Sequence, residues 1–144
     1  MPDGQEVTIL LVEDDPGHAR LIEKNLRRSN ITNDLLILTD GQQAIDYLFG
    51  EGEYVGTEHP ARLLMLLDLN LPVLDGYQVL QRMKGDERTK HIPVIVLTTT
   101  DDAREVDRCY ELGCNVYVTK PVDYEQFAEA SRKLGLFLAV VTVP

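Results

Sequence analysis

The chain has 144 residues, which is the length of one domain of ordinary size. Apolar residues make up 44% of it and charged residues 26%, a composition that is typical of a folded globular domain and excludes a disordered chain. The 14 basic and 24 acidic residues give a formal net charge of −10, so we expect no direct binding to nucleic acid or to a membrane surface.

Other classes of protein are disfavoured on similar grounds. No apolar run reaches the ~18 residues that a membrane span needs, and residues 1–6 lack the apolar segment of a secretory signal. Cys109 and Cys114 are too few for a disulfide framework, and we interpret them as buried or incidental thiols. We therefore expect a cytoplasmic protein. The acidic excess is compatible with a cation site, a basic partner or simple solubility.

Five short apolar runs are predicted to form strands: residues 7–12, 35–38, 63–67, 94–97 and 116–118. The first, third and fourth are nearly continuous in Val, Ile and Leu, which indicates strands covered on both faces of a parallel sheet. After each run, apolar residues recur with the period of a helix. These residues are Ala19, Ile22 and Leu26, with Leu21 beside them; Ala44, Leu48 and Phe49; Val79, Leu80 and Met83; Val106, Cys109 and Tyr110; and Phe127, Ala128, Ala130 and Leu134. The alternation predicts an α/β fold with a doubly wound parallel sheet.

One connection, residues 50–62, is longer than most loops of compact domains. It holds three glycines and Pro60, and it is predicted to be either a family insertion or a partner surface. No internal repeat or linker divides the chain, so we expect a single domain over residues 1–144.

Polar side chains follow all five runs, at the point where each predicted strand ends, and those after the second run, Thr39 and Asp40, are typical of an ordinary turn. Ligands of open α/β sheets bind beyond the carboxyl ends of the strands, so the residues after the other four runs are the candidates for a site. They are Asp14 and Asp15 after the first run, Asp68 after the third, Thr98 and Thr99 after the fourth, and Lys120 after the fifth. If the first and third strands are neighbours, three carboxylates converge and repel one another unless a cation lies among them. Oxygen ligands with a partly open coordination sphere favour Mg²⁺.

The same residues could support phosphoryl chemistry. An aspartate can attack phosphorus and form an acyl phosphate, while Lys120 and Thr98 offer an ammonium and a hydroxyl to the anion. Asp68 is the predicted nucleophile, because it stands alone at its strand end before a tight turn. Each residue also has a purely structural interpretation. Asp14 or Asp15 could cap a helix beginning near Pro16, and we expect one of them to do so as well as bind metal.

The chain resembles the receiver domain of two-component response regulators over residues 7–134. The resemblance is carried by residues 10–15, 67–72, 75–76, 93–98 and 120–121. The intervals agree as well, with 30 positions from Asp68 to Thr98 and 22 from Thr98 to Lys120. It implies a flavodoxin-like five-stranded sheet in the order 2-1-3-4-5. It also implies that Asp68 accepts phosphate from a histidine kinase.

The resemblance further implies a role for each matching residue. Direct Mg²⁺ ligands would be Asp15 and Asp68, with Asp14 acting through water and Asn70 through its backbone carbonyl. Lys120 would pair with the phosphoryl group, and Thr99 is small enough to leave the path to it open. Thr98 and Tyr117 would be the switch residues that move inward when the group is present.

More narrowly, the chain is similar to single-domain response regulators that partner phytochromes. This similarity implies a light-sensing kinase and a downstream phosphotransfer protein, with no output domain. Residues 135–144 form an apolar extension beyond the expected core, 7–134, and we expect it to form a homodimer contact or to fold back on its own core.

Two other functions compete. An aspartate-nucleophile phosphohydrolase typically has a second acid two positions after the nucleophile, where this chain has Asn70, which cannot protonate a leaving group. A flavodoxin-type binding module needs a hydroxyl-rich phosphate loop after the first strand, where the acidic residues 13–15 would repel phosphate. We therefore expect a signalling phospho-acceptor rather than an enzyme.

Overall fold

The computed structural model describes residues 7–28, 31–60, 62–99 and 102–120, together with residues 125, 126 and 129. The elements are, in chain order, β1 (Thr8–Val12), α1 (Pro16–Arg28), β2 (Leu35–Leu38), α2 (Gly41–Phe49), the short 3₁₀ helix η2 (Gly52–Tyr54), β3 (Leu63–Asp68), α3 (Gly76–Lys84), β4 (Val94–Thr98), α4 (Ala103–Glu111) and β5 (Val116–Thr119). All five predicted strands are present, to within one residue at each end. The residues that predict a fifth helix, Phe127, Ala128, Ala130 and Leu134, lie outside the described residues, as does the extension 135–144.

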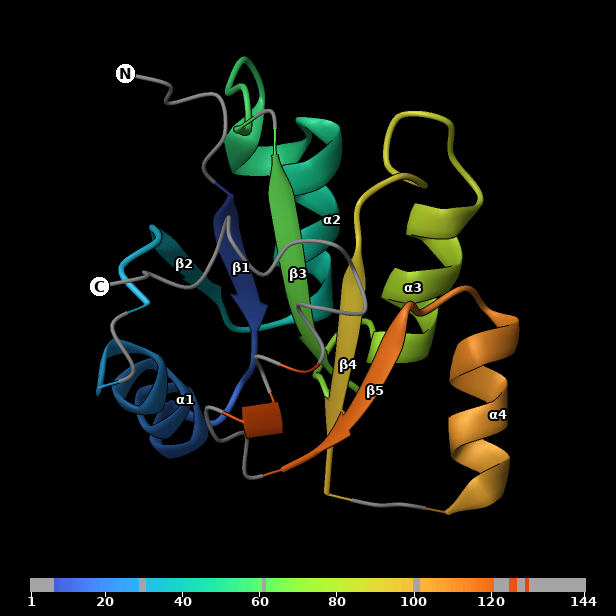
Figure 1. Cartoon of the computed structure of the whole chain (residues 1–144). Helices are drawn as coiled ribbons and strands as arrows, with labels where there is room; N and C mark the ends of the chain where they lie inside the picture. The colour runs from blue at the N-terminus through green and yellow to red at the C-terminus, as the bar shows by residue number, and fades with distance from the viewer. Residues whose placement is uncertain are drawn as a thin grey trace.

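The strands form one parallel sheet in the order β2-β1-β3-β4-β5 (Figure 1). This confirms the doubly wound sheet expected from the pattern and the strand order implied by the resemblance. Leu11 is level with Leu66 across the pair of β1 and β3, and Leu67 is level with Val96 across the pair of β3 and β4. Because β1 and β3 are neighbours, the residues that follow them meet at one edge of the sheet.

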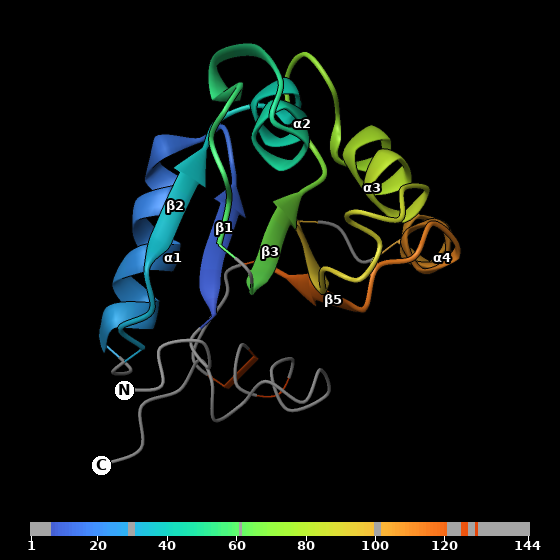
Figure 2. The ribbon, with the colours of Figure 1, turned by 90° about the horizontal axis from the view of Figure 1, so that it is seen from above.

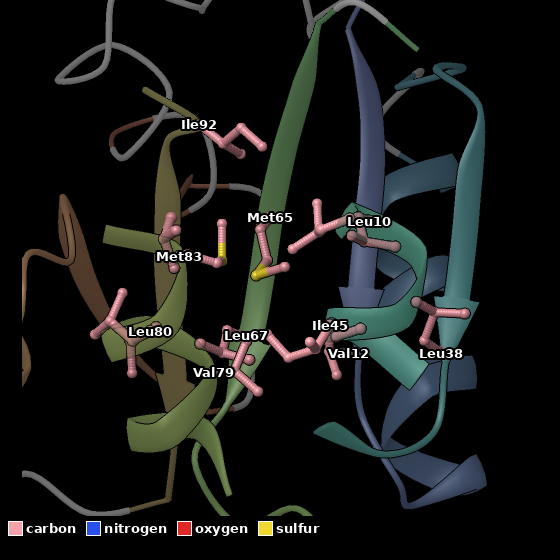
Figure 3. Close-up of a cluster of buried hydrophobic side chains, with 14 of the residues drawn as sticks. Leu10, Val12, Leu38, Ile45, Met65, Leu67, Val79, Leu80, Met83 and Ile92 are labelled. Carbon is pink, nitrogen blue, oxygen red and sulfur yellow. The ribbon is translucent and has the colours of Figure 1, made fainter. Parts of the chain in front are cut away.

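Helices cover both faces of the sheet, with α1 on one side and α2 and α3 on the other (Figure 2). The pleat sends alternate residues of β3 to the two sides: Leu64 and Leu66 pack with α1, whereas Met65 and Leu67 pack with α2 and α3. Figure 3 shows the second of these clusters, in which Met83 of α3 lies beside the strand residues. Burial on both faces explains why the central runs are almost entirely aliphatic.

The helices begin where acidic side chains cap their free N–H groups. Asp40 accepts a hydrogen bond from the Gln43 backbone at 2.8 Å and starts α2. Asp75 does the same for α3, and the Gln78 side-chain oxygen accepts a bond from the Asp75 backbone N–H, which completes a capping box. Within the described residues, no helix has the length and apolar character needed to cross a bilayer.

One residue predicted on a buried helix face is exposed instead: Tyr110 is 47% exposed, so placing it on the buried face of α4 was wrong. Leu21, expected beside the buried face of α1, is 45% exposed. Neighbouring helical residues are ~100° apart, and Leu21 therefore points away from the buried Ile22. In α4, whose nine residues give only a short face, Cys109 is the fully buried residue and Tyr110 turns outward.

Contacts with α2 hold the first part of the long connection that follows this helix. It contains η2, whose Tyr54 ring meets Tyr47 of α2 edge-to-face at 5.3 Å between centroids. The backbone N–H of Glu51 donates to the Asp46 carbonyl at 2.9 Å. Whether this segment is a family insertion or a partner surface stays a prediction.

Candidate functional site

The carboxyl ends of the central strands bring three acidic side chains together. Carboxylate oxygens of Glu13, Asp14 and Asp68 all lie within 4.8 Å of one another. Glu13 is 1% and Asp68 4% exposed, whereas Asp14 faces solvent. The convergence of the first and third strand ends was predicted, but Glu13 had been given no role.

Asp15 lies outside this acidic cluster because it caps α1. Its Oδ1 accepts hydrogen bonds from the backbone N–H groups of Gly17 at 2.8 Å and His18 at 3.1 Å. The His18 bond is the main cause of the lowered pKa of Asp15. Of the two capping candidates in the sequence, Asp15 is therefore the one that caps.

Lys120 supplies the positive charge of the site. Its ammonium donates to Glu13 Oε1 and lies 3.4 Å from Asp68 Oδ1, and the side chain is only 8% exposed. The backbone N–H of Lys120 donates to the Thr98 carbonyl at 2.7 Å, which ties the segment after β5 to the end of β4. A residue 107 positions from Glu13 thus completes a buried ion pair.

The charges of the cluster do not cancel. Burial is the main cause that raises the pKa of Asp68 to about 6; Lys120 opposes this rise and Glu13 adds to it. Two buried carboxylates share one ammonium, and the carboxylate of Asp14 is a third negative group at the solvent side. An oxygen-only cluster with excess negative charge and one open side fits a hard divalent cation such as Mg²⁺.

The loop from β3 to α3 holds Asp68 in place. Leu69 and Leu71 are buried and anchor it, and the Gly76 N–H donates to the Leu69 carbonyl at 2.9 Å. Val73 is 73% exposed with φ of 70°, a left-handed conformation that is costly for a β-branched residue. The loop that follows Asp68 therefore contains a strained residue, five positions after the aspartate.

The remaining predicted residues lie around the same edge. Thr98 is 1% exposed at the end of β4, where it is level with Thr119 of β5, and Thr99 is exposed. The Asn70 backbone N–H donates to the Asp68 carboxylate, and the Asn70 side chain faces solvent. Tyr117 is half-buried and packs against the core under α2 and α3.

The sequence matches a known protein family. The profile of the response regulator receiver domain matches residues 9–132. The chain belongs to this family. Receiver domains accept a phosphoryl group on an aspartate, so the function expected from the sequence is confirmed at the level of the family.

Individual receiver proteins are similar to this chain over most of its length. It is 41% identical to the response regulator Rcp1 of Synechocystis sp. over 137 residues, which are 94% of this chain and 92% of Rcp1. The bacteriophytochrome response regulator RtBRR superposes with a TM-score of 0.83 at 41% identity, over 96% of this chain and 83% of RtBRR. The Mn²⁺-bound form of Rcp1 superposes with a TM-score of 0.75, over 96% and 99% of the two chains. The receiver thus resembles single-domain regulators along nearly its full length.

Proposed function

We propose that Asp68 is the phosphoryl acceptor of this receiver domain. The observation that carries the proposal is the position of its Oδ1, at the end of a central strand, 3.4 Å from the Lys120 ammonium and within an acidic cluster. Asp68 would attack phosphorus of a phosphohistidine. The P–N bond then breaks with its electron pair on the imidazole nitrogen, and an acyl phosphate forms. Lys120 offsets the charge of the equatorial oxygens.

Mg²⁺ is the proposed cofactor, held directly by Asp14 and Asp68 and by the backbone carbonyl of Asn70. Glu13 would complete the set through water. The bound ion would supply charge neutralisation for the transferred group. Asp15 was the direct ligand expected from the resemblance; the capping bonds of its Oδ1 favour Asp14 in that role. Support for a divalent ion comes from the acidic cluster and from the Mn²⁺-bound form of Rcp1.

The switch would involve Thr98 and Tyr117, as the resemblance implies. Thr98 is buried and its backbone carbonyl accepts the Lys120 N–H, so a movement of Thr98 would act directly on the segment that carries Lys120. Tyr117 lies on β5 against the core, which suits a ring that changes position with the threonine. Thr99 is exposed and small, and it would leave the acceptor open to the donor.

The proposed donor is a histidine kinase of the phytochrome type, and the proposed reader is a phosphotransfer protein. The similarity to RtBRR and Rcp1 supports this choice. We also propose a homodimer held by the apolar residues 134–141. Sedimentation of the full chain against a chain ending at Lys133 tests the dimer; a monomer in both cases contradicts it.

The acceptor is tested with acetyl phosphate and Mg²⁺, read by intact mass. We expect one added phosphoryl group, lost in Asp68→Asn and lost with a chelator. Asp75→Asn is the matched control, since it removes the same charge nearby while asparagine still caps α3. Phosphate that persists in Asp68→Asn would show that another residue is the acceptor.

A further inference from the structure

The Lys120 ammonium has a third acceptor besides the two carboxylates. His18 Nδ1 lies 3.4 Å from Lys120 Nζ. An ammonium carries three N–H groups, and the described residues offer it three acceptors: Glu13 Oε1, Asp68 Oδ1 and His18 Nδ1. An ammonium can only donate, so a hydrogen bond at this distance requires the His18 tautomer that carries its hydrogen on Nε2.

The start of α1 determines where His18 lies. It is the third residue of the helix, and its backbone N–H donates to Asp15 Oδ1 at 3.1 Å. The ring is 47% exposed, and its Nδ1 lies 3.8 Å from Asp15 Oδ2 and 3.9 Å from Glu13 Oε1. The helix cap therefore fixes the backbone of His18, and the ring lies at the solvent side of the buried ion pair.

An uncharged acceptor at this place has a specific advantage. Lysine has a flexible four-carbon stem, so each acceptor that it meets restricts where its charge can lie. A third carboxylate in the position of His18 would also restrict it, but would repel an incoming phosphoryl group. The imidazole provides a lone pair without adding negative charge.

We propose that His18 is a positioning residue that holds the Lys120 ammonium at the acceptor carboxylate for phosphoryl transfer. The inference rests on the proposed function, because it assigns Lys120 to the transferred group. Without His18, one N–H of Lys120 turns to water and the ammonium is held by the two carboxylates alone. The acceptor site is then less well organised when the donor arrives.

Three substitutions separate this role from a general structural one. His18→Leu removes the hydrogen-bond acceptor Nδ1 and puts an apolar side chain in its place. His18→Asn places an amide oxygen at the position of Nδ1, whereas His18→Gln carries its amide one methylene further out. His91→Leu is the control, since His91 is an exposed histidine that precedes β4 at the opposite edge of the sheet.

Two measurements are made on each variant. The first is the rate of Asp68 phosphorylation by acetyl phosphate with Mg²⁺. His18→Leu and His18→Gln should slow it about fivefold, which corresponds to a lost hydrogen bond of ~1 kcal/mol. His18→Asn should restore it to within about twofold of the wild type, and His91→Leu should leave it unchanged. The second is hydrogen exchange at the Lys120 ammonium, followed by ¹⁵N NMR without a phosphodonor, which should quicken in His18→Leu and slow again in His18→Asn.

The possible outcomes are distinguishable. Wild-type rate and ammonium exchange in His18→Leu would overturn the inference, as would equal losses in His18→Leu and His18→Asn. If the wild type gains no phosphate on Asp68, the proposed function fails, and the ammonium exchange alone decides the contact between His18 and Lys120. Urea midpoints identify a variant that does not fold, and His18→Gln then takes the place of His18→Leu.

Discussion

Replacing Gly76 by alanine would test how closely the first turn of α3 approaches Asp68, the proposed acceptor. A Cβ at this position would lie 2.5 Å from the Asp68 carbonyl oxygen and 2.7 Å from Leu69 Cα, where real contacts are essentially never under 3.0 Å. The backbone must therefore shift by at least ~0.5 Å, and such overpacking costs about 1–3 kcal/mol. Alanine recovers up to about 1 kcal/mol through its helix propensity. We expect a net loss of about 1–2 kcal/mol in the free energy of unfolding.

The same shift should impair phosphorylation, because both crowded atoms belong to the acceptor segment. A displacement of ~0.5 Å at Asp68 should slow transfer from acetyl phosphate about tenfold. Urea unfolding followed by circular dichroism gives the stability, and intact mass against time gives the rate. Gly17→Ala is the matched control in the first turn of α1, where the nearest atom is the side-chain oxygen of Asp15 at 3.2 Å. Wild-type stability and rate in Gly76→Ala would refute the reasoning, since the backbone would then have room for a methyl group.

Three further predictions follow from charges and burial away from that turn. The pKa of about 6 for Asp68 means that a proton competes with Mg²⁺ there, so calorimetry should find binding ~4-fold weaker at pH 5.5 than at pH 7.5; equal affinities would contradict Asp68 as a ligand. Burial raises the pKa of Cys109 and raises that of Cys114 to about 12, so neither thiol should react with Ellman's reagent at pH 8 until urea unfolds the chain, and rapid native labelling would count against their burial. Lys84 donates to two backbone carbonyls, at 2.7 and 3.1 Å, so Lys84→Met should lower the free energy of unfolding in urea by about 1–2 kcal/mol. Lys90→Met, which removes an exposed ion pair, should lower it by under ~0.5 kcal/mol; equal effects would show that the carbonyls need no donor.

The strands were predictable because their constraint is local. A strand buried on both faces must be apolar at every position, and β3 shows this from Leu63 to Leu67. Short helices carry less information, since nine residues of α4 are compatible with more than one buried face. Tyr110 was placed on the wrong side for this reason. The order of the strands came from the resemblance, because the apolar pattern alone left more than one topology open.

The acidic residues after β1 show where local sequence rules suffice and where they do not. Proline favours the first helical position and aspartate the position before it, so Pro16 at the start of α1 already indicates Asp15 as the cap. That assignment leaves Glu13 and Asp14 to face the other strand ends. The burial of Glu13 could not be inferred in the same way, because a buried carboxylate needs a partner and Lys120 lies 107 positions away. The ion pair exists only once β5 has joined the sheet, and the charge balance of the site is therefore a property of the completed fold.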